Sequence, residues 1–236
     1  MKVDVCFSPA LYPAYHRSDA VVVVVDIFRA TTTIAVAFEN GVRSIRPVAS
    51  TEEAKAYKNK GWLVGAERNA RRCDFADFGN SPFEYTPEKV LGKDLIFTTT
   101  NGTKTINHAK AAHCIITGAF VNLQHVADFC LNQQRDVVVL CSGWENKINI
   151  EDTLFGGALY EQLQMSGYQS AGDATAVALS LWNEAKSDLQ GYTEQSEYVK
   201  RLKNNGLEDD ISYCLTQNSL SAVPLFDKKE NKLIIQ

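Results

Sequence analysis

The sequence predicts a three-layer α/β/α fold, in which helices cover both faces of a largely parallel β-sheet. Residues 21–25 are five consecutive valines that end at Asp26. An unbroken β-branched run of this length is typical of a strand that is buried on both faces, as strands of parallel sheets are. The order of elements gives a second indication, because a βαβαβ pattern occurs twice along the chain and is characteristic of parallel sheets.

The first βαβαβ pattern spans about residues 20–67, and the second spans about residues 94–143. Gly41 ends the helix that follows the valines, and Ser50 begins the next helix as its N-cap. The two patterns resemble a degenerate duplication. The expected strands are 21–25, 42–48, 62–65, 95–100, 113–118 and 136–142, and the expected helices are 31–40, one from residue 50 onward, 102–111 and 122–132.

The segment between the two patterns, residues 66–93, has little periodicity, which in a compact domain indicates a functional loop. After residue 142 we expect a helical C-terminal part. Trp144, in the loop that begins it, is expected to be a packing residue, and a position at the edge of the pocket is the alternative. The expected helices are 151–165, 173–185, 194–204 and 207–216, and a terminal hairpin follows through 223–226 and 232–235. No low-complexity tract marks a separate unit, so we expect a single domain over residues 1–236.

The charge balance excludes some classes of partner. The 236 residues include 24 Lys and Arg against 28 Asp and Glu, a net charge of -4. The chain therefore has no overall basic field that would hold a nucleic acid. The valine run is far too short to cross a bilayer, so we expect no membrane partner and a cytoplasmic location. A homodimer is an open expectation that no motif decides.

Polar side chains follow the ends of four predicted strands. Open α/β sheets bind ligands at these ends, where helix N-termini present free backbone amides. Arg29 and Arg68 supply the paired donors that match phosphate oxygens, and Asp26 places a carboxylate beside them. Further hydroxyl and amide donors for the same phosphate belong to Thr32, Thr33, Thr100, Asn101, Gly102 and Thr103.

Three acids predict a divalent metal at the same place. Asp26, Glu151 and Asp152 offer hard oxygen ligands, and Mg²⁺ typically takes one or two carboxylates together with water and substrate phosphate. Each signal also has a simpler interpretation, because threonines commonly cap helices and acids in a first turn commonly favour the helix dipole. The recurrence of threonine-rich turns at the same topological place in both patterns favours a joint site for phosphoryl chemistry.

Several segments carry a resemblance to a known family. They are VVVVVDIFRATTT at 21–33, GAER at 65–68, DFGNSP at 77–82, TTTNGT at 98–103, the Ser142-Gly143 turn, the Glu151-Asp152 pair and LEDDISYC at 207–214. In this order and separation, and over nearly the whole chain, they resemble the 2-phosphosulfolactate phosphatase family of coenzyme M biosynthesis.

The resemblance implies an enzyme, a phosphoric monoester hydrolase with the three-layer fold. Its substrate would be a small phosphoester, 2-phosphosulfolactate, and its cofactor Mg²⁺. Asp26, Arg29 and Arg68 would then be catalytic, and Asp26 would also hold the metal with Glu151 and Asp152. Asn80 and Ser81, with Arg71 or Arg72, are candidates for the carboxylate and sulfonate of the substrate.

Two alternatives stay open at the level of the sequence. Asp26 is placed either to hold a metal that positions water or to act as a nucleophile that forms an acyl phosphate. The chain could also be a non-catalytic module that binds a phosphorylated or sulfonated metabolite. The acids favour the enzyme, because carboxylates near an anionic ligand repel it unless a metal intervenes.

Overall fold

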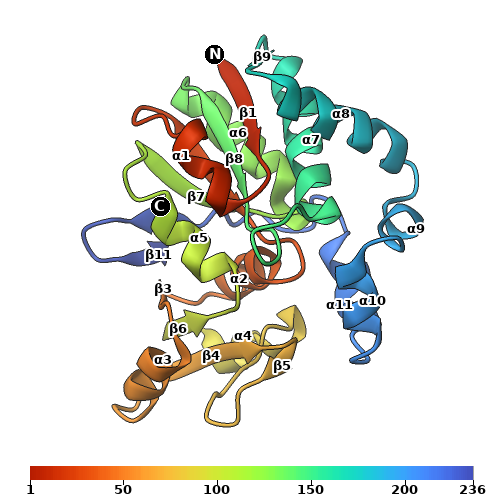
Figure 1. Ribbon diagram of the computed structural model, residues 1–236. Helices are drawn as coiled ribbons and strands as arrows, with labels where there is room; N and C mark the ends of the chain where they lie inside the picture. Colours follow the sequence, from red (N-terminus) through yellow and green to blue (C-terminus); the bar gives the residue numbers. More distant parts are fainter. Residues whose placement is uncertain (236) are drawn as a thin grey trace.

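A computed structural model describes residues 1–235 and shows one mixed sheet with helices on both of its faces (Figure 1). The strands are β1 (Lys2–Cys6), β2 (Val21–Val25), β3 (Ser44–Pro47), β4 (Leu63–Arg68), β5 (Arg71–Arg72), β6 (Asp94–Thr98), β7 (Cys114–Gly118), β8 (Val137–Cys141), β9 (Gln169–Ser170), β10 (Leu225–Asp227) and β11 (Lys232–Ile234). The helices are α1 (Tyr12–Tyr15), α2 (Ala30–Glu39), α3 (Thr51–Lys58), α4 (Pro87–Val90), α5 (Gly102–His108), α6 (Leu123–Gln133), α7 (Ile150–Gln164), α8 (Asp173–Ala185), α9 (Leu189–Thr193), α10 (Glu197–Lys203) and α11 (Glu208–Cys214).

The sheet consists of two parallel groups joined by the C-terminal hairpin. Its strand order is β5-β4-β6-β3-β11-β10-β7-β2-β8-β1-β9. The hairpin strands β10 and β11 are antiparallel to each other and to their outer neighbours β7 and β3. The group β4-β6-β3 therefore runs opposite to the group β7-β2-β8-β1. In Figure 1, β1 and β8 run almost vertically, whereas β4 and β6 run almost horizontally below them.

The two βαβαβ patterns are present along the chain, but they do not fold as two separate halves. β2, the first strand of the first pattern, pairs with β7 and β8 of the second. β6, the first strand of the second pattern, pairs with β3 and β4 of the first. Each pattern thus gives its first strand to the other group, and residues from both patterns come together where the groups meet.

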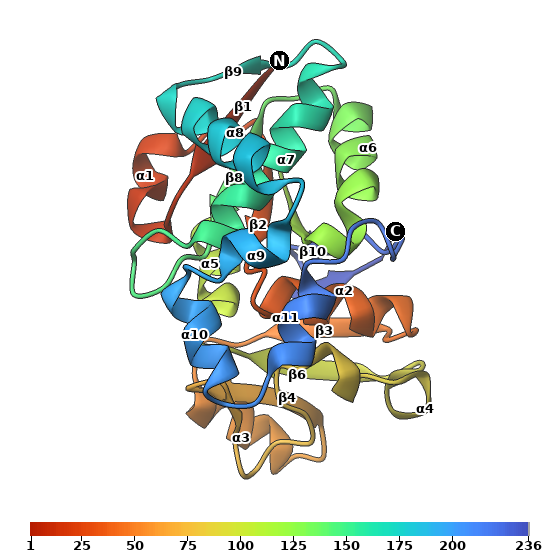
Figure 2. The same ribbon diagram turned by 90° about the vertical axis from the view of Figure 1, so that its right-hand side faces the viewer.

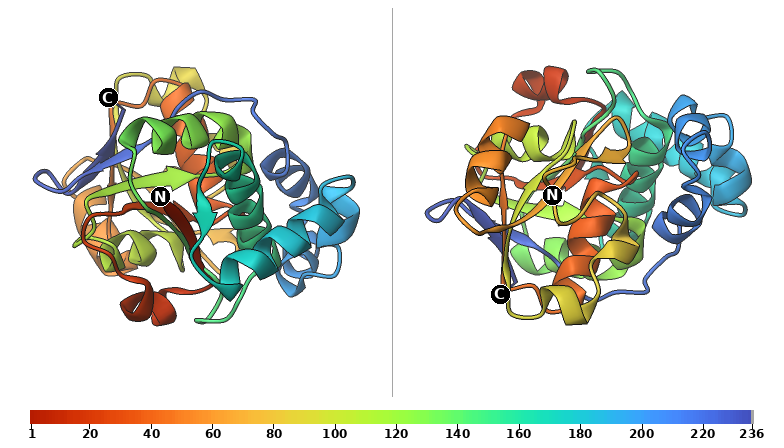
Figure 3. Two further views of the ribbon diagram at one scale, coloured as in Figure 1. Left: turned by 90° about the horizontal axis from the view of Figure 1, so that it is seen from above. Right: turned by 90° about the horizontal axis from the view of Figure 1, so that it is seen from below.

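The valine strand explains the three layers. Side chains of a strand alternate between faces, and here Val21, Val23 and Val25 pack into one core while Val22 and Val24 pack into another. The first core is closed mainly by α6, α7 and α8, and the second by α2 and α5. Figure 3 shows the helices on both sides of the strands. The predicted three-layer α/β/α fold with a largely parallel sheet is confirmed.

The structure differs from the prediction in some elements. β1 was not expected, although Val3 and Val5 alternate with polar residues as a half-buried strand requires. The helix expected at 194–204 begins only at Glu197, because the Ser196 hydroxyl accepts a hydrogen bond from the Tyr198 amide at 3.2 Å and so caps α10. The separate short helix α9 was not expected. The loop 66–93 contains only β5, α4 and one short 3₁₀ helix besides the end of β4. No helix within residues 1–235 has the length and apolar character that crossing a bilayer requires.

Candidate active site

The two threonine-rich turns meet at the boundary between the strand groups. A methyl group added to Gly102, at the start of α5, would lie 2.8 Å from Asp26 Oδ2 and 2.9 Å from Ala30 Cβ. Only a residue without a side chain allows so close an approach. The strands that precede these turns, β2 and β6, belong to groups that run in opposite directions. The convergence itself is confirmed.

Asp26 follows the valine strand and is held in place by the first turn of α2. Its backbone carbonyl accepts hydrogen bonds from the Thr31 amide and the Thr31 hydroxyl, both at 3.0 Å. Burial raises the pKa of the Asp26 carboxyl to about 6, and the charge of Glu67 acts in the same direction. Hydrogen bonds from the Ala30 and Gly102 amides oppose this rise. The carboxyl of Asp26 thus titrates close to neutral pH.

Asp152, in the first turn of α7, joins the ends of β2 and β8. One of its oxygens accepts from the Ile27 amide at 2.9 Å, and the other accepts from the Gly143 amide at 3.1 Å. The side chain is buried, and burial together with the charges of Glu151 and Asp26 raises its pKa well above the usual range. Because both of its oxygens are engaged by the backbone, Asp152 fixes the positions of two strand-end turns.

Glu151 is also buried, but only half of its carboxyl is engaged. Oε2 accepts a hydrogen bond from the Ser196 hydroxyl at 3.3 Å, whereas Oε1 is buried without a hydrogen-bond partner. Burial raises the pKa of Glu151 to about 7, the Ser196 hydroxyl lowers it, and the charge of Asp26 raises it further. Glu151 is therefore an acid whose free oxygen has no partner within the folded chain.

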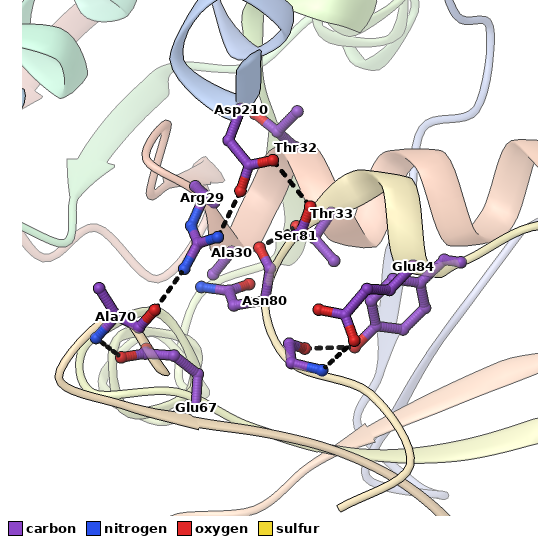
Figure 4. A network of polar contacts seen from close by, with 12 residues as sticks. Arg29, Ala30, Thr32, Thr33, Glu67, Ala70, Asn80, Ser81, Glu84 and Asp210 are labelled. Carbon is purple, nitrogen blue, oxygen red and sulfur yellow. Dashed lines mark hydrogen bonds and ion pairs between the residues drawn. The ribbon is translucent and has the colours of Figure 1, made fainter. Parts of the chain in front are cut away.

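Arg29 is buried in an ion pair that the sequence did not predict. Its guanidinium pairs with Asp210 of α11, and Nη2 donates to the Ala70 carbonyl at 3.4 Å (Figure 4). The other oxygen of Asp210 accepts from the Ser81 hydroxyl at 2.7 Å. Arg29 Nε is buried without a partner. Helix α11, through Asp210, therefore orients the arginine that follows β2.

The threonines of the two turns are used differently. The hydroxyls of Thr32 and Thr33 donate to the carbonyls of Ile27 and Asn80, at 3.0 and 2.8 Å. Both hydroxyl hydrogens are thus already used in hydrogen bonds within the protein. The predicted role of these threonines in phosphate binding stays a prediction. Thr103 is likewise buried, and its hydroxyl lies 3.5 Å from the backbone nitrogen and carbonyl oxygen of Thr99.

Thr100 and Asn101, in contrast, are partly exposed and line two cavities. One, of about 320 Å³, also touches Lys104 and Ser142. The other, of about 100 Å³, also touches Glu67. The second turn is therefore the open one, and it is the part of the predicted phosphate site that a ligand can reach.

Arg68 and Glu67 end β4 at the same place. Arg68 Nη2 donates to the Thr98 hydroxyl at 3.0 Å, and Nη1 donates to the Glu67 carbonyl at 2.5 Å. Glu67 is buried, and its Oε1 accepts from the Ala70 amide at 2.5 Å. Arg68 is thus fixed between the ends of β4 and β6, beside the open turn.

Buried polar atoms without partners gather around these strand ends. Buried polar groups are nearly always hydrogen-bonded, so each exception requires an explanation. Seven such side-chain atoms occur within residues 1–235, and five of them belong to this region. The five are Arg29 Nε, Asn80 Oδ1, Thr99 Oγ1, Ser142 Oγ and Glu151 Oε1. The region is built with hydrogen-bonding capacity that the chain itself does not use.

The metal site predicted at Asp26, Glu151 and Asp152 stays a prediction. Within residues 1–235, no group of three or more histidine, cysteine or acidic side chains is arranged to hold a metal ion. Asp152 accounts for part of this, because two backbone amides already occupy its oxygens. The donors that remain are Asp26 and the free oxygen of Glu151. They fit Mg²⁺, which typically binds one or two carboxylates and completes its coordination shell with water and substrate phosphate.

Sequence reasoning missed several residues of this region. Asp210 shares a helix face with the buried Ile211 and Cys214, so the helical period could have marked it as a buried acid in need of a partner. Ser196, Tyr198 and Arg201 had no comparable signal, because they lie in short helices that pack over the site from far along the chain (Figure 2). Trp144, expected mainly as a packing residue, lines the cavity that Thr100 and Asn101 also line, which agrees with the alternative position at a pocket edge.

An α/β fold with arginines, acids and unsatisfied donors gathered at its strand ends defines a class of protein that acts on small phosphorylated molecules. A sequence model of the family described as 2-phosphosulpholactate phosphatase matches residues 6–229. The chain belongs to the 2-phosphosulfolactate phosphatase family, which makes it a phosphoric monoester hydrolase by family, as the sequence segments predicted.

Curated relatives agree with this assignment. A protein of Carboxydothermus hydrogenoformans is 37% identical over 239 residues, which cover 100% of this chain and 98% of the relative. A protein of Caldanaerobacter subterraneus subsp. tengcongensis is 35% identical over 207 residues, 86% of each chain. A protein of Thermotoga maritima is 35% identical over 94% of each chain. Each is named a probable 2-phosphosulfolactate phosphatase.

Proposed function

We propose that this protein hydrolyses the phosphate ester of 2-phosphosulfolactate to give sulfolactate and phosphate. The observation that carries the proposal is the group of five buried polar atoms without partners around the ends of β2, β4, β6 and β8. A polyanionic ester would accept hydrogen bonds from the three donors in this group, which are Arg29 Nε, Thr99 Oγ1 and Ser142 Oγ. The names of the relatives support the choice of this ester.

The chain contributes charge and position to the reaction. Arg29 and Arg68 would bind phosphoryl oxygens, and the open turn at Thr100 and Asn101 would add neutral donors. Donors held in place before the reaction stabilise the developing charge, and one such donor is typically worth about 3 to 4 kcal/mol in the transition state. Asp210 supports this role indirectly, because it fixes the orientation of Arg29.

Magnesium dependence is part of the proposal. When bound, Mg²⁺ would neutralise charge on the phosphoryl oxygens and orient water. Asp26 and Glu151 would hold the ion, while Asp152 would keep the β2 and β8 turns in register through its two amide contacts. Three mutually repelling buried acids with raised pKa values also favour a cation among them.

Phosphate release from a panel of esters tests the activity. The panel contains 2-phosphosulfolactate, phospholactate and phosphoglycolate, each assayed with Mg²⁺ and with EDTA. We expect release to be fastest from 2-phosphosulfolactate and to stop in EDTA. Binding of the ester without release, in the presence of Mg²⁺, would identify the non-catalytic module instead.

Asp26 has two chemical roles between which a labelling experiment decides. As a nucleophile, Asp26 would form an acyl phosphate, and an acid quench during turnover of ester labelled with phosphorus-32 would leave label on the protein. As a metal ligand, Asp26 would stay unlabelled, and all of the label would be recovered in the ester and in free phosphate.

The remaining expectations belong to the same proposal. They are a place in coenzyme M biosynthesis, a cytoplasmic location and assembly as a homodimer. The first is tested by the identity of the preferred ester, and the last by the mass of the protein in solution.

A further inference from the structure

The cavity of about 100 Å³ beside the open turn contains a cation to which the proposed reaction gives no role. The cavity lies between Thr100 and Asn101, the β4-β5 turn and helix α10. Among the residues that line it, Arg201 of α10 is the only basic one. Figure 2 shows α10 within the arm of short helices that crosses from the upper strand group to the lower one. A ligand whose phosphate contacts the open turn would therefore extend toward Arg201.

Arg201 is held in a defined orientation. Its Nη2 donates to Asn69 Oδ1 at 3.0 Å, and its guanidinium carbon lies 5.5 Å from the centre of the Trp144 ring. Tyr198, one helical turn earlier, packs against the same ring with a centroid distance of 6.4 Å. A guanidinium has five N–H donors, and within residues 1–235 only this one hydrogen bond from Arg201 is formed. The remaining donors are free to bind an anion.

The cations that the sequence suggested for the acid groups of the substrate, Arg71 and Arg72, do not line this cavity. Arg71 Nε donates to Asn205 Oδ1 at 3.2 Å, and Arg72 lies 3.9 Å from a carboxylate oxygen of Glu84. The Ser81 hydroxyl donates a hydrogen bond to Asp210. None of these three residues lines the cavity.

We propose that Arg201 determines substrate specificity by binding the acid group of the ester, a carboxylate or a sulfonate, that lies away from the phosphate. The proposal rests on the proposed function. A planar guanidinium held over an aromatic ring matches the oxygens of either group in a paired geometry, which a lysine cannot reproduce. Recognition of this kind selects esters that carry an additional acid group over simple phosphomonoesters.

Four substrates separate the contribution of each acid group. 2-Phosphosulfolactate has both groups, phospholactate has the carboxylate, the phosphate ester of 2-hydroxyethanesulfonate has the sulfonate, and ethyl phosphate has neither. We expect Arg201→Ala to lower kcat/KM for 2-phosphosulfolactate by about 30-fold, mainly through KM, because a hydrogen bond to a charged group is worth about 1.5–3 kcal/mol. The loss should recur with the one-acid ester whose group Arg201 binds and should stay below twofold for ethyl phosphate. Arg201→Lys should recover only part of the loss.

The matched control is Lys200→Ala, which removes the same charge from the neighbouring position of α10. Lys200 pairs with Glu197 and does not line the cavity, so all four kinetic profiles should stay unchanged. Equal losses of Arg201→Ala on all four esters, or no loss on any, would overturn the proposal. A lowered unfolding midpoint with uniform losses would show that Arg201 only holds α10 in place.

Binding of sulfolactate, measured by calorimetry, is a readout that does not depend on hydrolysis. We expect the Kd to rise at least tenfold in Arg201→Ala and not in Lys200→Ala. If the wild-type protein hydrolyses none of the four esters but binds sulfolactate through Arg201, the proposed function fails while this inference stands. If sulfolactate binds equally to both variants, the inference fails whatever the kinetics show.

Discussion

Asp94, at the amino end of β6, and Asp26, at the carboxyl end of β2, both lie at the ends of buried strands, yet their surroundings act on them in opposite directions. Asp94 accepts hydrogen bonds from Arg43 Nε at 2.9 Å and from the Ser44 hydroxyl at 2.6 Å, and these contacts lower its pKa to about 2. The pKa of Asp26 is raised to about 6, and the pKa values of its neighbours Glu151 and Asp152 are raised as well.

The difference shows which acids serve the fold. A carboxyl with a lowered pKa is charged at neutral pH and stabilises the folded state, whereas a carboxyl with a raised pKa makes the folded state less stable once it ionises. Groups that reduce stability and lie together at strand ends are typical of functional sites. The acids beside Gly102 therefore have a use outside folding, and the following substitutions test that distinction.

Asp26→Asn should have the largest effect, a fall in kcat on the order of 10⁴-fold, because the change removes the carboxylate that serves as metal ligand or as nucleophile. The same change should stabilise the protein. Because the folded pKa lies above the ordinary 3.8, wild-type stability from this group is greatest below pH 3.8 and falls as the pH rises through about 6. Phosphate release and urea unfolding at pH 8 measure the two effects, and unfolding should require about 3 kcal/mol more in the variant. A variant that is both active and less stable would remove Asp26 from the site.

Asp210→Asn should lower both the stability and the activity of the protein. It leaves the buried Arg29 guanidinium without an anion, and breaking a buried pair in this way costs about 3–5 kcal/mol. Activity should fall at least tenfold, because Arg29 loses its fixed orientation. Thermal unfolding and steady-state kinetics are the measurements. Arg29→Lys is the companion variant, which should retain the charge pair with Asp210 but lose the paired donors and so the activity.

Glu151→Gln should change the pH dependence of stability. The folded pKa of about 7 lies above the ordinary 4.5, so the contribution of Glu151 is fully present below pH 4.5 and is lost as the pH rises through about 7. The wild-type protein should therefore lose up to about 3 kcal/mol between pH 4.5 and pH 8 that the variant keeps. Unfolding by urea in EDTA at both pH values measures this. Parallel pH profiles for the two proteins would contradict the prediction.

The sequence predicted the parts of the molecule that depend on local pattern. The valine run, the caps at Gly41 and Ser50, and the helical periods of α6, α7 and α8 are short-range signals, and the corresponding elements lie where they were expected. The strand-end positions of Asp26, Arg68 and Asn101 follow from the same signals.

The sequence could not predict how distant parts pair. The hairpin β10-β11 was expected as a terminal addition, but it lies between β7 and β3 and so sets the two parallel groups in opposite directions. The pairing of Arg29 with Asp210 joins residues 181 positions apart, and the contact of Arg201 with Asn69 joins residues 132 positions apart. Such contacts are decided by tertiary packing, which no local period encodes.

Asp94→Asn should have the smallest effect and provides the reference for the acids of the site. Asp94 lies away from both cavities at the open turn, so kcat/KM should not change. The folded pKa of about 2 lies below the ordinary 3.8, so the stabilisation is present above pH 3.8 and is lost as the pH falls through about 2. Because Arg43 is exposed, its ion pair with Asp94 contributes little to the free energy of unfolding. The unfolding midpoint at pH 7 should therefore fall by about 2 °C in the variant. The difference between the two proteins should vanish near pH 2, where Asp26→Asn and wild type should also converge. A loss of activity in Asp94→Asn would mean that the contrast between the two kinds of acid does not separate folding from function.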